Sequence, residues 1–259
     1  MNARNYSYWV FALAALSPFF GALLTGFEGK PGASTAGLLH LAFAGLLAVV
    51  VAVQAVVLRR EQRNARILNA AALVLVALEA LSGGGGVAAL PDSGAVMHAL
   101  LAPLVAGLCA VIPDLLAPDA DWVPLEHGRA LRLISFWLPP LTLLQIIFGA
   151  LYRHKIWGIL PHMAGALVVA LLSLIVCTLL MQRAPVGTRV RSAAVMLLSA
   201  VLTQVTLGIA AFVMRLLEID TTMAFTIVAA LHVATGSAVF FTGSALALRA
   251  QKIAFGESQ

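Results

Sequence analysis

The sequence predicts an all-α, polytopic membrane protein with eight transmembrane helices arranged as two pseudo-symmetric four-helix bundles. Of its 259 residues, 61% are hydrophobic and only 10% are charged. A soluble domain of this length needs far more polar surface. Long apolar segments occupy most of the chain, and a motif of the first segment recurs in the fifth. No sizeable soluble domain is therefore expected.

Each predicted helix follows from segment length. Crossing about 30 Å of hydrocarbon takes about 20 apolar residues in a helix. The segments that meet this requirement, or approach it, are Tyr8–Leu24, Ala36–Leu58, Ile67–Leu81, Gly94–Leu116, Leu133–Leu151, Leu160–Leu180, Ala193–Leu216 and Met223–Leu248. We expect an N-terminal bundle at 1–117, a cytoplasmic linker at 118–132, a C-terminal bundle at 133–250 and a tail at 251–259.

An internal repeat supports the two-bundle organisation. Trp9 matches Trp137, and the stretch FGAL at 20–23 matches FGAL at 148–151, all at one offset of 128 residues. A repeat that spans half the chain indicates two homologous units. It also predicts that the first segment is retained as a helix rather than removed as a signal peptide.

The positive charges are distributed asymmetrically. If the N-terminus is cytoplasmic, 12 of the 16 Lys and Arg residues fall in inner segments, and only Lys30, Arg153, Lys155 and Arg215 fall in outer ones. This fits the positive-inside rule with both termini inside. The net charge of +5 is therefore explained by topology and not by nucleic acid. We expect a bacterial-type inner membrane and the lipid bilayer as the main environment.

Every even-numbered segment carries one histidine, and these are His40, His98, His162 and His232. The topology places all four in the outer half of the membrane. A histidine in hydrocarbon is costly and usually faces a partner or a cavity. Four at matching places favour metal ligation, and the natural pairs, His40 with His98 and His162 with His232, would each hold one heme iron. Structural hydrogen bonding and zinc are the alternatives.

The odd-numbered segments share a polar or small residue followed four positions later by glycine. These pairs are Ser17/Gly21, Glu79/Gly83, Gln145/Gly149 and Gln204/Gly208. One interpretation is a groove in which the backbone approaches a flat ligand while the polar group turns inward. Ordinary close packing of helices through small residues is the other.

Several cations lie at the outer edge of the C-terminal half. Arg153, His154, Lys155 and Arg215 could pair with the two propionates of a heme, or could simply extend to the lipid interface. The matching region of the N-terminal half has only Lys30. We therefore expect a more tightly held heme in the C-terminal half.

On these features the chain resembles the heme A synthase family of cytochrome oxidase assembly. The resemblance covers nearly the whole chain and is carried by the histidine pattern, by QIIFGALYRH at 145–154 and by QVTLG at 204–208. It implies oxidation of the heme O methyl group to give heme A, with substrate in the N-terminal half and a heme b cofactor in the C-terminal half. His162 and His232 would then bind heme b, while His40 and His98 flank the substrate; Gln145 and Gln204 belong to the cofactor pocket.

The chain departs from that family at two places. The residues before His40 are Gly37, Leu38 and Leu39, where the family has a glutamate, and no cysteine pair occurs in 27–35. Glu79 is the candidate substitute acid, and a protonated packing residue is the alternative for it. Three functions stay open: an active oxidoreductase served by a membrane redox partner, a b-type heme electron-transfer subunit of a respiratory complex, and a heme carrier or small transporter.

Overall fold

The computed structural model describes residues 2–27, 33–83, 92–117 and 128–251, and these contain helices and no strand. The elements, in order, are α1 (Ala3–Ala14), α2 (Ser17–Phe27), α3 (Ala33–Val57), the short 3-10 helix η1 (Leu58–Arg60), α4 (Arg63–Gly83), α5 (Asp92–Leu115), α6 (Gly128–Arg153), α7 (Leu160–Arg183), α8 (Arg189–Leu216) and α9 (Met223–Gln251).

Eight spans in the described residues are long and apolar enough to cross a membrane. Many large apolar side chains lie on the outside of the bundle: Leu81, Leu160 and Leu38 are 80%, 76% and 69% exposed. In water such a surface would aggregate, whereas in a bilayer it contacts acyl chains. The protein is therefore a multi-pass, all-α membrane protein, as its sequence predicts.

The first span differs from the single helix that the sequence predicts. It consists of α1 and α2, which are separated by a turn at Ala15 and Leu16. Pro18 follows this turn and has no N–H to donate to the carbonyl of Ala14, so the helical hydrogen-bond ladder is broken there. The two pieces together still form one span, Ala3–Phe27.

Most predicted boundaries lie within a few residues of the observed ones. The two largest differences are equal: the first span begins at Ala3 and not at Tyr8, and α6 begins at Gly128 and not at Leu133. Residues 128–132 are therefore helical where a linker was predicted. The linker residues 118–127, Lys30 and the tail beyond Gln251 lie outside the described residues.

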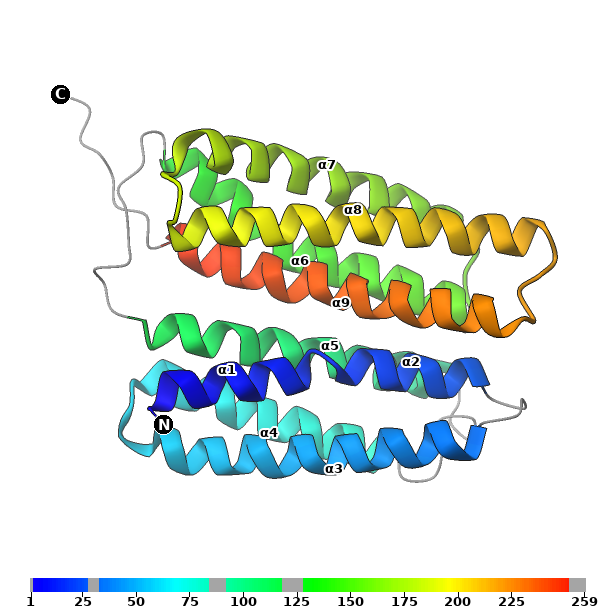
Figure 1. The fold of residues 1–259 in the computed structure, drawn as a ribbon, viewed down its shortest axis with the longest axis horizontal. Coiled ribbons are helices and arrows are strands. Elements are labelled where there is room, and N and C mark those ends of the chain that lie inside the picture. Colours follow the sequence, from blue (N-terminus) through cyan, green and yellow to red (C-terminus); the bar gives the residue numbers. More distant parts are fainter. Residues whose placement is uncertain (1, 28–32, 84–91, 118–127, 252–259) are drawn as a thin grey trace.

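The helices form two groups, α1–α5 and α6–α9, lying side by side (Figure 1). α9 packs on α5 and α2 of the N-terminal half, and α5 also contacts α6. In the most apolar part of α5, 72% of the residues are buried inside the protein, whereas the share is at most 33% in each of the other spans. α5 and α9 therefore form the seam between the halves.

A buried ionic cluster joins the halves at the end where α1 begins. Asp114 of α5 is 1% exposed and accepts hydrogen bonds from Arg189 at 2.5 Å and from Arg249 at 2.8 Å. Arg189 also donates to the hydroxyl of Tyr8 at 2.9 Å. Because a buried carboxylate is stable only when paired, this cluster fixes α1, α5, α8 and α9 to one another.

Candidate functional site

The four membrane histidines lie toward one end of the bundle. α3, α5, α7 and α9 run in the same direction (Figure 1), and each carries its histidine in its first half. The opposite end collects most of the arginines, which lie in η1, at the starts of α4, α6 and α8 and at the ends of α7 and α9. The histidines and the basic residues thus mark opposite ends of the bundle.

The structure brings the histidines together in the two expected pairs. The ring centroids of His40 and His98 are 6.2 Å apart with an interplanar angle of 75°, and those of His162 and His232 are 6.1 Å apart at 79°. Each pair joins two helices of one half. The same geometry recurs in both halves although the surrounding sequences differ.

Glycines on the preceding helices make room for the rings. A Cβ added at Gly149 would lie 3.0 Å from Cε1 of His162, and one at Gly208 would lie 2.9 Å from Cε1 of His232. At Gly21 the corresponding distance to Cε1 of His40 is 3.5 Å. The sequence suggested that these glycines admit a flat ligand; in the structure the space beside each is filled by an imidazole.

Gln145 of α6 holds His162. Its amide nitrogen Nε2 lies 2.9 Å from Nδ1 of the imidazole and donates to the backbone oxygen of His162 at 2.7 Å. The amide oxygen Oε1 of Gln145 is buried without a hydrogen-bond partner. An imidazole that binds metal through Nε2 donates its Nδ1–H to an acceptor. Rotating the Gln145 amide by half a turn would place its oxygen Oε1 beside Nδ1 of His162 and provide that acceptor.

Gln204 of α8 holds His232 through both ring nitrogens. Nδ1 of His232 lies 3.2 Å from the backbone oxygen of Gln204, which can only accept. This contact places the proton on Nδ1 and leaves Nε2 as the unprotonated ring nitrogen. The amide nitrogen of Gln204 lies 3.2 Å from that Nε2, and Thr235 donates to the amide oxygen. A metal at Nε2 requires the Gln204 amide to turn aside.

The N-terminal pair has a sparser environment. Nδ1 of His98 lies 2.9 Å from the hydroxyl of Ser82, which also donates to the backbone oxygen of Glu79 at 3.1 Å. When the hydroxyl hydrogen bonds to that carbonyl, the Ser82 oxygen accepts Nδ1–H of His98, and Nε2 is then the unprotonated ring nitrogen. Glu79 itself is only 6% exposed. A carboxylic acid thus lies one turn of α4 from the residue that orients His98.

No family model matches this chain, and no curated protein has a significantly similar sequence. The site is therefore interpreted from its own geometry.

The ring spacing in each pair can be compared with that of two imidazoles that hold one metal atom. A metal bound about 2.0–2.1 Å from a nitrogen of each ring separates opposed ring centroids by roughly 6 Å, close to the 6.1 and 6.2 Å observed. Among the described residues, no three His, Cys, Asp or Glu side chains gather into a group that could hold a bare metal ion. Two ligands per site suit an iron whose other four ligands come from a macrocycle.

The cations of the C-terminal half take different positions. Arg215 donates to the hydroxyl of Tyr152 at 2.6 Å and lies 3.5 Å from Asp220. The ring of Tyr152 stacks on His162, with centroids 6.5 Å apart and 10° between the planes. Arg153 instead reaches α2 of the other half, and Lys155 is exposed. Of the cations expected at the heme edge, Arg215 contacts the tyrosine that stacks on His162.

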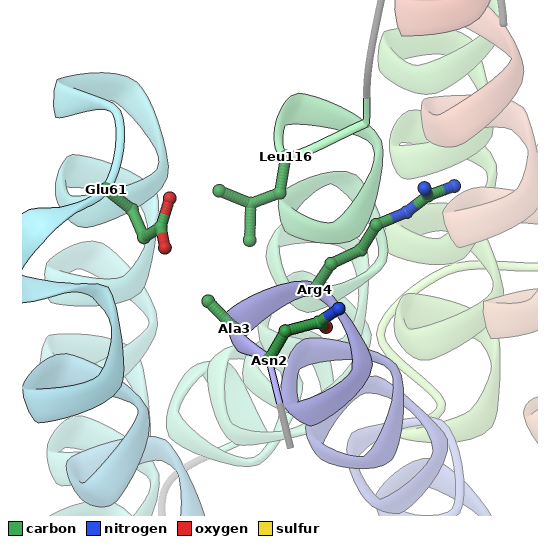
Figure 2. Close-up of a pocket in the computed structure, with 5 residues that line it drawn as sticks. All are labelled: Asn2, Ala3, Arg4, Glu61 and Leu116. Carbon is green, nitrogen blue, oxygen red and sulfur yellow. The ribbon is translucent and has the colours of Figure 1, made fainter.

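A separate hollow of about 260 Å³ lies at the basic end and is lined by Asn2, Ala3, Arg4, Glu61 and Leu116 (Figure 2). Figure 2 shows the Arg4 side chain pointing away from Glu61. The hollow contains no histidine and lies at the end of the bundle opposite to both pairs.

Sequence reasoning did not identify Ser82, Tyr152 or Thr235 as site residues. Tyr152 and Thr235 had a usable signal, since each lies within a turn or two of a motif residue on the same helix. Ser82 had the same signal, since it lies between Glu79 and Gly83 on α4, but a serine next to a glycine run is also typical of a helix end.

Proposed function

We propose that this chain is a heme-binding integral membrane protein of the heme A synthase type. The observation that carries the proposal is the pair of perpendicular imidazoles about 6 Å apart in each half. His162 and His232 would bind heme b as a resident cofactor, and His40 and His98 would flank heme O, the substrate that becomes heme A. Heme supplies the electron-transfer and oxygen chemistry that protein side chains lack.

The residues around each pair would hold and orient these groups. Gln145 and Gln204 fix the rings of His162 and His232. Arg215, anchored through Tyr152, would pair with a propionate at the edge of the C-terminal site, and Lys155 would add positive charge there.

Glu79 would be the proton-handling group of the N-terminal site. It is buried one turn from Ser82, the residue that orients His98. Glu79→Gln keeps the shape and removes the acid, so we expect normal heme content with heme O oxidation reduced at least about 100-fold. Unchanged oxidation in membranes supplied with heme O would remove Glu79 from the mechanism.

The proposal is tested by identifying the bound heme. We expect purified protein to give a reduced-minus-oxidised spectrum of low-spin heme, and its extracted heme to include heme O or heme A beside heme b by mass. Cells given heme O should accumulate heme A only when the chain is expressed. Protein that binds no heme at all would contradict the proposal.

A b-type electron-transfer subunit of a respiratory complex is the second candidate. It is favoured by Gly37, Leu38 and Leu39, which leave no acid on the turn before His40. This candidate predicts that the protein binds heme b alone and that a membrane redox partner reduces this heme. Glu79→Gln should then change neither the heme content nor the reduction. A heme carrier, the third candidate, predicts heme that transfers to an apoprotein acceptor without any redox change.

The proposed orientation follows from charge. The end rich in arginine would face the cytoplasm of a bacterial-type inner membrane, with both termini inside and the histidine pairs toward the outer face. A reporter that is active only in the cytoplasm should then be active when it is fused after Gln251, and a reporter that requires the outer side should be inactive there.

A further inference from the structure

Arg153 makes a contact that the proposed cofactor pocket does not explain. It is the last residue of α6 and belongs to the C-terminal half. Its guanidinium donates to the backbone oxygen of Ala22 at 3.0 Å and to the hydroxyl of Thr25 at 2.5 Å, both on α2 of the N-terminal half. The neighbouring Tyr152 instead stacks on His162 in its own half. Two consecutive residues therefore contact different halves, and the charge of Arg153 also acts on His232 of its own half.

The contacted part of α2 is the part that backs His40. Gly21, whose added Cβ would lie 3.5 Å from Cε1 of His40, directly precedes Ala22. Thr25 donates to the carbonyls of Gly21 and Ala22 at 3.4 and 3.1 Å, so it links Arg153 to the same turn. On the adjacent face, Phe20 packs on Phe43 of α3 at 4.8 Å between ring centroids. This turn of α2 therefore packs directly against His40 and its helix.

α2 needs such an anchor because it is short and is separated from α1 by the Pro18 break. A second contact from the C-terminal half reaches the same helix: Thr226 of α9 donates to the backbone oxygen of Gly26 at 3.2 Å. A charged donor makes a stronger hydrogen bond than a neutral one, and more so where water is excluded. Arg153 is therefore the stronger of these two anchors.

We propose that Arg153 is a positioning residue for the N-terminal histidine pair, acting across the seam by fixing α2 behind His40. Heme affinity of the N-terminal site then depends on a side chain of the C-terminal half. The effect on heme affinity rests on the proposed function. The anchoring of α2 by Arg153 does not depend on it.

The test uses full-length protein in nanodiscs with hemin as the probe. His162→Ala isolates the N-terminal site and His40→Ala isolates the C-terminal site. Adding Arg153→Gln should weaken hemin binding about tenfold at the N-terminal site and less than about twofold at the C-terminal site. Arg153→Lys, which keeps one charged donor, should recover part of the loss. The matched control Arg215→Gln should show the reverse preference.

A second readout needs no heme. In otherwise wild-type protein, Arg153→Gln should speed amide hydrogen exchange of 17–27 at least about tenfold and leave that of α7 unchanged. Thr25→Val removes the hydroxyl acceptor while keeping Arg153, and should give a smaller change in the same direction. Arg215→Gln should leave exchange of 17–27 as it was.

The outcomes separate the two claims. If the isolated sites bind no hemin but Arg153→Gln still loosens α2, the proposed function fails and the anchoring role stands. If Arg153→Gln weakens only the C-terminal site and leaves α2 exchange unchanged, the inference is overturned and Arg153 is a propionate partner. Faster exchange throughout all helices would also overturn it, because the residue would then support general stability.

Discussion

The two histidine pairs have the same ring geometry but different surroundings. In the C-terminal half, two glutamines contact the imidazoles, Tyr152 stacks on His162, and the backing glycines lie so close that an added Cβ would come within 3.0 Å of a ring atom. In the N-terminal half, among the described hydrogen bonds, only Ser82 contacts a ring nitrogen. A Cβ added at Gly21 would lie 3.5 Å from Cε1 of His40.

This difference shows how one repeated scaffold can provide two kinds of site. Rings locked by hydrogen bonds and packing lose little further entropy on binding, which favours a permanently bound cofactor. Rings with fewer contacts can adapt to a ligand that enters and leaves. The N-terminal half also has a buried acid, Glu79, where the C-terminal half has glutamine.

The largest expected effect distinguishes the pairs by their ligands. His162→Ala should abolish the tightly held heme, a loss greater than the roughly 10–100-fold that outer contacts contribute. His40→Ala should leave that heme in place and remove only the more weakly held one. Pyridine hemochrome assays and heme-to-protein ratios before and after washing with apomyoglobin measure both.

If both substitutions removed heme equally and at the same rate, the two sites would be equivalent. The contrast between a resident cofactor and an exchangeable ligand would then be wrong.

A second effect comes from the residues that orient the rings. Gln145→Leu should weaken the C-terminal heme by roughly 10–100-fold, because His162 loses its fixed orientation. Gln204→Leu should have a smaller effect, because the backbone oxygen of residue 204 still contacts Nδ1 of His232. Ser82→Ala should weaken the N-terminal heme by only a few-fold, since a single hydroxyl contact is worth about 1 kcal/mol. Hemin titration of the single-site proteins measures these affinities. A larger effect for Ser82 than for the glutamines would reverse the comparison.

The glycines give a smaller and more geometric test. Gly208→Ala and Gly149→Ala should push the imidazoles aside at a cost of about 1 kcal/mol, roughly a fivefold loss of affinity. Gly21→Ala should be tolerated, because 3.5 Å is an ordinary contact distance. Equal losses at all three positions would mean that helix packing, and not ring position, governs the response.

The smallest expected effect concerns Tyr152. Tyr152→Phe keeps the ring that stacks on His162 and removes the hydroxyl that Arg215 contacts. We expect a loss of about twofold to fivefold at the C-terminal site and none at the N-terminal site, where Leu24 occupies the position offset by 128 residues. Soret titration of the two single-site proteins measures it, and an effect at the N-terminal site would contradict the separation of the pairs.

Much of the fold could be predicted from the sequence. Apolar segments of membrane-spanning length set the eight spans, because hydrocarbon admits few structures other than helices. The break at Pro18 was missed, since one apolar run hid two helices. The start of α6 was placed too late because Arg129 and Arg132 look like linker, although charged residues at a helix end can remain helical at the membrane surface.

The candidate site was predicted less completely. One histidine per even span was enough to predict which rings would meet. The glutamines were identified, but their contacts with ring nitrogens, and the filling of the glycine space by imidazole, depend on side-chain direction across two helices. The reach of Arg153 into the other half could not be predicted, because nothing in the local sequence specifies a partner 128 residues away.

Low-temperature EPR of the oxidised wild-type protein shows directly whether each half holds one heme between two imidazoles. We expect low-spin ferric signals from two sites, with His162→Ala removing one and His40→Ala the other. A high-spin signal, a single site that survives both substitutions, or no heme signal after reconstitution with hemin would contradict it.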